Sequence, residues 1–168
     1  MAATKYGEYV IREPLHQSTS GIPTFHICTE EGCVAARFPG FPNEITMIGI
    51  AAPTTMNPQP HAHEYDQLLL FWGGNPLNFF EFDAEVEVFL GKEGEKHVID
   101  TTAVVYVPKG LVHCPINYRR VGKPILFMQI CDAPQYTRSV GDMSGHPAHG
   151  TRTRFPEEQV LKLRRGIT

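Results

Sequence analysis

The sequence predicts an all-β protein, a sandwich or a barrel of short strands, and two observations support this. Short runs rich in β-branched and aromatic residues recur along the chain, separated by prolines, glycines and asparagines, as in the turns at residues 52–53, 73–76 and 108–110. The 15 glycines and 14 prolines exceed an average share, which favours many turns over long helices. Regularly spaced short strands with such turns are typical of sandwiches and barrels.

The elements are expected within one domain, because 168 residues suit one domain with a substantial core. Residues 1–21 are expected to form an N-terminal arm, residues 22–132 the β domain, and residues 133–168 a polar strap that ends in a short helix. The expected strands are Thr24–Cys28, Val34–Phe38, Ile45–Ala51, Tyr65–Trp72, Glu85–Leu90, Val98–Ile99, Ala103–Val107 and Ile125–Cys131.

The short C-terminal helix is expected to begin at Pro156, because proline suits the first helical position. Acidic residues 157–158 follow in its first turn, and Lys162 with residues 164–165 supplies positive charge to its last turn, as the helix dipole favours.

Charge and cysteine content exclude several classes of protein. The net charge of -3 provides no basic surface for nucleic acid, so no nucleic-acid partner is expected. The longest apolar run, Leu68–Trp72, is far shorter than the ~20 residues of a membrane helix, and residues 1–16 show no export signal, so a cytoplasmic protein without a membrane partner is expected. The four cysteines contain no C-x-x-C pair, and we expect all of them to be reduced.

Residues 61–67 (HAHEYDQ) contain the most informative pattern. In a strand, alternate side chains share a face, so His61, His63, Tyr65 and Gln67 point the same way, whereas Glu64 and Asp66 face the other side. Two imidazoles and an amide oxygen on one face can bind one metal ion. Residues 108–117 (PKGLVHCPIN) follow another strand and place His113 after a Pro-Gly turn, so His113 supplies the missing ligand.

These two stretches resemble the motifs of the cupins. Residues 61–74 fit H-x-H-x3-(E/Q)-x6-G, and residues 108–117 fit P-x-G-x2-H-x3-N, although the leading glycine of each motif is replaced by Thr55 and Thr102. The resemblance covers residues 45–131 and implies a jelly-roll barrel, a double-stranded β-helix, with a metal ion in its mouth. It implies that His61, His63, His113 and Gln67 are ligands of one divalent transition metal, which can be Fe, Mn, Ni, Co or Zn.

Gln67 stands where many cupins have glutamate, and this changes the charge of the site. Three neutral imidazoles and one amide leave the charge of a divalent ion uncompensated. We therefore expect the site to attract anionic oxygen ligands and to act as a Lewis acid.

Other residues on the ligand face are weaker candidates. Tyr65 is the candidate proton carrier, and Phe71, Phe127 and Gln129 are candidates for lining the substrate cavity. Cys114 is expected to face away from His113 and to be a small core residue.

The predicted function is that of a metal-dependent enzyme acting on a small, oxygen-rich, anionic molecule, such as a sugar acid or an oxo acid, by lyase or isomerase chemistry. The alternatives are an iron-dependent dioxygenase and a binding protein without turnover, because one fold serves many functions. A homodimer is expected, and the aromatic residues of the segment Asn75–Phe82 are expected to contribute to the core or to the dimer contact.

Overall fold

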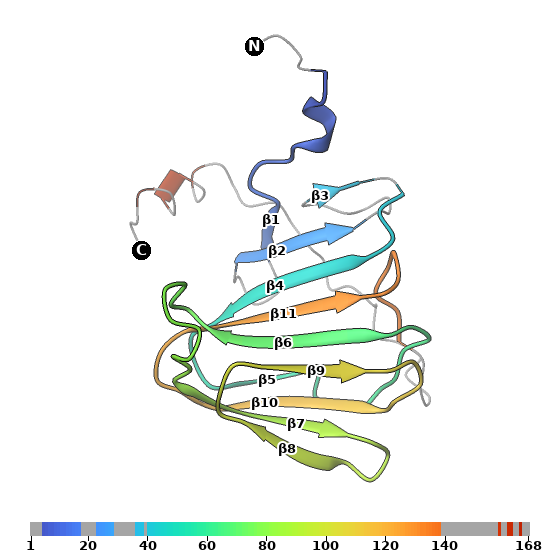
Figure 1. Ribbon diagram of the computed structural model, residues 1–168, viewed down its shortest axis with the longest axis vertical. Helices are drawn as coiled ribbons and strands as arrows, with labels where there is room; N and C mark the ends of the chain where they lie inside the picture. The colour runs from blue at the N-terminus through green and yellow to red at the C-terminus, as the bar shows by residue number, and fades with distance from the viewer. Residues whose placement is uncertain are drawn as a thin grey trace.

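The computed structural model describes residues 5–17, 23–28, 36–38 and 40–138, together with Glu158, Leu161, Lys162 and Arg165. Two β-sheets pack on each other to form a jelly-roll type of sandwich (Figure 1). The larger sheet has the strand order β1-β2-β4-β11-β6-β9, with β3 beside β2, and the smaller sheet has the order β5-β10-β7-β8. The sheets are not closed into a barrel, so the prediction of a barrel was wrong, while the all-β prediction is confirmed.

The strands are short and separated by turns, as the sequence predicted. A 3-10 turn, η1, spans Gly7–Tyr9 within the expected arm. The strands are β1 Leu15–Gln17, β2 Pro23–Cys28, β3 Ala36–Arg37, β4 Glu44–Ile50, β5 Thr54–Met56, β6 Gln67–Gly73, β7 Ala84–Leu90, β8 Glu95–Ile99, β9 Ala103–Val107, β10 His113–Val121 and β11 Ile125–Cys131.

The core lies between the two sheets. Alternate side chains of β6 and β7 are buried, as the period of two in a strand requires. The fully buried side chains of Leu69 and Phe71 come from the larger sheet, and those of Val86, Ile116 and Tyr118 come from the smaller sheet. In the smaller sheet this packing fixes the register of β7, because a slip of one residue would turn Glu85 and Glu87 toward the core.

The hairpin between β7 and β8 shows how the sequence directs a turn. Gly91 and Gly94 adopt φ angles of 78° and 68°, in the left-handed region that glycine enters at little cost. The turn joins the alternating strand β7 to β8, and β8 begins at Glu95, three residues before the expected strand.

Several local predictions differ from the structure. Residues 61–66 are not a strand, and β6 begins only at Gln67. Strands β1 and β5 were not expected, because three residues are too few to show a pattern; β1 joins part of the expected arm to the larger sheet through β2. The division of the chain at residues 21/22 and 132/133 stays a prediction.

The C-terminal helix is not delimited by the structure. Glu158, Leu161 and Lys162 have helical backbone, and the Nζ of Lys162 lies 3.0 Å from the Oε1 of Glu158, but the rest of the predicted helix falls outside the described residues. Among the described residues, no helix is long and apolar enough to cross a membrane.

The cysteines differ from the expectation of four reduced thiols. Cys114 and Cys131 are free and buried, whereas Cys28 is disulfide-bonded. The prediction was therefore wrong for Cys28, because it relied on the absence of a C-x-x-C motif, and a disulfide requires only that two cysteines meet in the fold.

Candidate metal centre

Three buried histidines meet at the end of the sandwich where β6 and β10 begin. His61 and His63 precede β6, and His113 is the first residue of β10; their exposed fractions are 1%, 1% and 2%. Their ring centroids lie 4.5 to 5.0 Å apart. A backbone bridge joins His61 to His113, with each N–H donating to the other carbonyl at 3.0 and 2.8 Å. This bridge holds the two segments together despite their separation in sequence.

Each imidazole is oriented by a backbone carbonyl. The Nδ1 atoms of His61, His63 and His113 lie 2.9, 2.5 and 3.1 Å from the carbonyl oxygens of Gln59, Thr137 and Leu111 respectively. A carbonyl oxygen can only accept, so each Nδ1 carries the proton and each Nε2 keeps its lone pair. Such a hydrogen bond from the second ring nitrogen is typical of metal-binding histidines.

Burial keeps these imidazoles neutral. Desolvation lowers the pKa of His61 to about 3 and that of His63 to about 4, and it also lowers the pKa of His113. The site therefore presents uncharged ligands at neutral pH.

Two buried acceptors of the predicted ligand set have no hydrogen-bond partner. These are the Nε2 of His63 and the Oε1 of Gln67. The Nε2 of Gln67 donates to the Sγ of Cys131 at 3.5 Å, which leaves the amide oxygen as the atom able to bind a cation. Buried polar atoms without partners are rare, so a ligand that satisfies them, such as a metal ion, fits this site.

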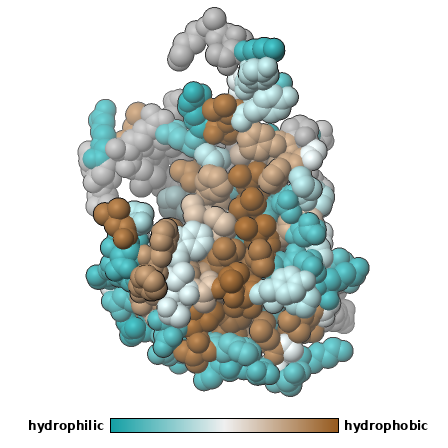
Figure 2. Space-filling view, viewed as in Figure 1, coloured by the Kyte–Doolittle hydropathy of each residue, from teal (hydrophilic) through white to brown (hydrophobic). Residues whose placement is uncertain are grey.

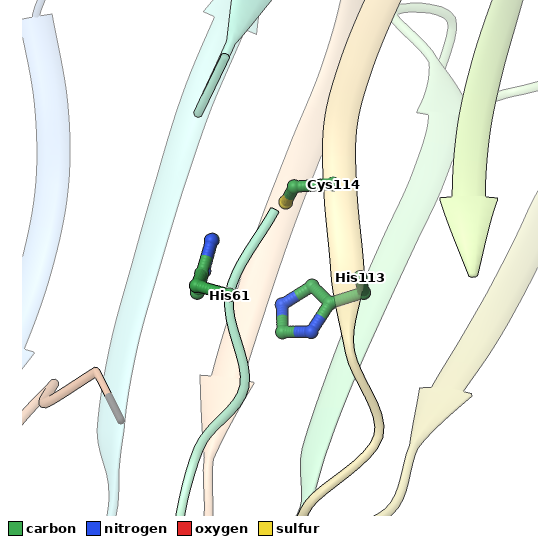
Figure 3. Close-up of side chains that lie close together, drawn as sticks. All are labelled: His61, His113 and Cys114. Carbon is green, nitrogen blue, oxygen red and sulfur yellow. The ribbon is translucent and has the colours of Figure 1, made fainter. Parts of the chain in front are cut away.

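Cys114 is a buried core residue, as predicted, but it does not face away from the histidines. One ligand atom from each of His61, His113 and Cys114 lies within 4.8 Å of the others (Figure 3). Side chains do not alternate regularly here, because Cys114 has φ 78° and the pairing of β10 with β7 is irregular between His113 and Ile116. Burial raises the pKa of the Cys114 thiol to about 12, so the thiol is protonated when no metal is bound.

The segment after β11 covers the histidines, and its role was missed because its residues match no motif. Tyr136 is buried, and its hydroxyl lies 3.1 Å from the Nε2 of His61. The backbone N–H of Tyr136 donates to the Oε2 of Glu44, at the start of β4. The Nε of Arg138 donates to the Tyr136 hydroxyl at 3.0 Å, and another guanidinium nitrogen donates to the Oδ1 of Asn57 at 2.6 Å. An exposed cationic side chain therefore lies beside the site.

Tyr65 lies beside the site with its hydroxyl already engaged. Its ring stacks on His63 at a centroid distance of 4.9 Å. Its hydroxyl donates to the carbonyl of Thr137 and accepts the N–H of the same residue, both at 3.0 Å. Tyr65 thus holds the covering segment in place, and its role as a proton carrier stays a prediction.

The predicted cavity residues fall into two groups. Phe71 and Phe127 are fully buried in the core, where they pack on each other and on Tyr118. Gln129 is half-buried near the metal centre, and its Nε2 donates to the Sγ of Cys131 at 3.4 Å. Contact of these three residues with a substrate stays a prediction.

Comparison with known proteins shows similarity in fold. No family model and no curated protein matches the sequence. Among solved structures, peruvianin-I, a cysteine peptidase from Thevetia peruviana latex, is 10% identical with a TM-score of 0.52, covering 83% of this chain and 80% of its own. KdgF from a Halomonas species is 18% identical with a TM-score of 0.43, covering 71% and 86%. An RmlC-like cupin family protein from Methanocaldococcus jannaschii with a double-stranded β-helix fold is 18% identical with a TM-score of 0.38, covering 55% and 70%.

Proposed function

We propose that the chain is a cupin and a metal-dependent enzyme acting on a small, oxygen-rich anion, on the basis of its two cupin-like motifs, its two-sheet fold and its buried histidines. The observation that supports this best is the orientation of the three imidazoles. Each of them has its Nδ1 beside a backbone carbonyl, which leaves the Nε2 lone pair of each ring available as a metal ligand. The three ring centroids lie 4.5 to 5.0 Å apart, although the ligand atoms within 4.8 Å of one another are those of His61, His113 and Cys114.

The proposed ligands are His61, His63, His113 and Gln67, with Cys114 as a competing fourth ligand. Neutral imidazoles suit Fe, Mn, Co, Ni and Zn alike. A divalent ion held there supplies Lewis-acid polarisation of substrate oxygen atoms.

The charges around the site favour an anionic substrate. The imidazoles are neutral, and Gln67 adds no negative charge. The nearby carboxylate of Glu44 is turned to His26, whose Nε2 lies 2.9 Å from its Oε1. The guanidinium of Arg138 is exposed beside the site and can bind a carboxylate through N–H groups that do not contact Tyr136 or Asn57.

The proposed chemistry is of the lyase or isomerase type, in which a proton moves between substrate atoms. Tyr65 is the proposed carrier, and the Tyr136 hydroxyl beside the Nε2 of His61 is the competing one. The alternatives are an iron-dependent dioxygenase and a binding protein without turnover.

Metal content tests the proposal directly. Protein purified without a His tag is expected to contain one equivalent of a divalent transition metal by elemental analysis. His61→Ala and His113→Ala are expected to lose it while their circular dichroism stays that of a β protein. His97→Ala is the matched control, because His97 is exposed on β8 and paired with Glu95. Wild type that stays metal-free after supplementation, or histidine variants that keep full metal content, would contradict the proposal.

Oxygen uptake separates the two enzyme classes. The metal-loaded protein is incubated with small oxo acids and sugar acids while dissolved oxygen and products are recorded. Product formation without oxygen consumption supports lyase or isomerase chemistry. Consumption matched to product would identify a dioxygenase, and binding without product would identify a binding protein.

A further inference from the structure

The outer face of the larger sheet is apolar across five strands. Side chains at alternate positions of β2, β4, β11, β6 and β9 point away from the core, and nearly all of them are hydrophobic. We call this set the outer apolar face; it comprises Phe25, Ile27, Ile45, Met47, Leu68, Leu70, Trp72, Val104, Tyr106, Leu126, Met128 and Ile130.

The strand register aligns these residues into continuous rows. Met47 is paired with Met128, Met128 with Leu70, and Leu70 with Val104. The neighbouring row continues from Ile45 through Ile130 and Leu68 to Tyr106 by the same pairings. Figure 2 shows the result as a hydrophobic band down the middle of the view, over the central strands of the larger sheet.

The smaller sheet of the same molecule provides the contrast. Its outward positions include Glu85, Glu87 and Lys96, and Lys96 pairs with Glu87 at 3.3 Å. A sheet packed on one side ordinarily alternates apolar residues toward the core with polar residues toward water. The smaller sheet follows this rule. The larger sheet does not, because its strands are apolar on both faces, a pattern that is typical of a sheet covered on both sides.

We propose that the outer apolar face binds the same face of a second copy of this chain. No charged side chain lies among its residues, so two identical faces meet without like-charge repulsion even though each chain has a net charge of -3. A two-fold axis through the patch buries the same residues on both copies.

The size of the face suits such an interface. Five strands about 4.8 Å apart, each contributing about 20 Å of length, present a patch on the order of 450 Å² in projection. A standard interface buries roughly 800 Å² per partner, so this face alone supplies a little over half of that area. At its edge, Leu77, Phe79 and Phe80 are 95%, 61% and 94% exposed. Thr102, next to β9, holds their loop by donating to the carbonyl of Phe79.

Analytical ultracentrifugation of the full chain tests the proposal. Wild type is expected to sediment as a dimer, and Leu70→Lys combined with Met128→Lys is expected to raise the dimer dissociation constant by at least ~100-fold, because charge replaces buried apolar area at the centre. Val98→Lys is the matched control, since Val98 is an exposed apolar residue on the outward side of the smaller sheet. It should leave the dimer intact.

A second measurement needs no variant. Trp72 is the single tryptophan of the chain and belongs to the outer apolar face, so dilution of wild type through the dissociation constant is expected to shift its emission to longer wavelength. A wild type that is monomeric at all soluble concentrations would overturn the proposal. A folded double variant that dimerises as tightly as wild type, or a Val98→Lys variant whose dimer is weakened as much as that of the double variant, would also overturn it.

Discussion

At the scale of single residues, histidine chemistry is decided by neighbours that the sequence does not reveal. His26 and His61 are both buried, but the Nε2 of His26 lies 2.9 Å from a carboxylate, whereas that of His61 lies near a tyrosine hydroxyl. The spacing H-x-H predicted that His61 and His63 are buried together, although residues 61–66 form no strand. The positions of Cys114 and Tyr136 beside the histidines could not be predicted. Cys114 is placed there by its own left-handed backbone, and Tyr136 belongs to a segment that matches no motif.

Gln67→Glu tests the charge of the proposed metal site at this scale. The substitution adds a negative charge among the ligands, so metal affinity should hold or rise while binding of pyruvate and glucuronate to the metal-loaded protein weakens about tenfold. Calorimetric titration measures the metal affinity and the anion affinity of each variant. Asn78→Asp adds the same charge in an exposed loop and serves as the control. Unchanged anion affinity in Gln67→Glu would contradict the charge argument.

At the scale of elements, buried polar contacts connect the covering segment to the sheet. Glu44 begins β4, accepts the backbone N–H of Tyr136, and lies 2.9 Å from the Nε2 of His26 on β2. The strands themselves were predicted from their composition and turns, and their pairing follows from burial of alternate residues. The path of the covering segment could not be predicted, because it depends on hydrogen bonds between residues about 70 to 90 positions apart.

Glu44→Ala tests this connection. The variant leaves the buried N–H of Tyr136 and the ring of His26 without their acceptor, and we expect the free energy of unfolding to fall by about 3 kcal/mol. Urea denaturation measures this, and metal content is expected to fall as well because Tyr136 and Thr137 cover the histidines. Glu85→Ala, at an exposed position of β7, should leave the unfolding midpoint nearly unchanged. If Glu44→Ala and Glu85→Ala have equal free energies of unfolding, the contact of Glu44 with Tyr136 and His26 does not stabilise the fold.

At the scale of the whole molecule, the sandwich joins two sheets with different outer surfaces. The run Leu68–Trp72 is apolar at every position, and the strand register shows that four other strands of the larger sheet also have apolar outer faces. The sequence therefore predicted an all-β fold and the histidine cluster, but not two open sheets. It could not predict whether the sheets close, because closure depends on the pairing of edge strands, and the edge strands β1, β5 and β8 are short or were partly missed.

The redox state of the whole chain provides the last prediction. Denatured protein that has not been reduced should show two free thiols per chain, Cys114 and Cys131, because Cys28 is disulfide-bonded. Full reduction should reveal four. In the native protein the two thiols should react much more slowly than a free cysteine, because burial raises their pKa to about 12 and about 11 and leaves little thiolate at pH 8. A thiol reagent measures all three states. Four thiols without reductant would contradict the disulfide and restore the reduced state expected of a cytoplasmic protein, whereas two would favour folding under oxidising conditions.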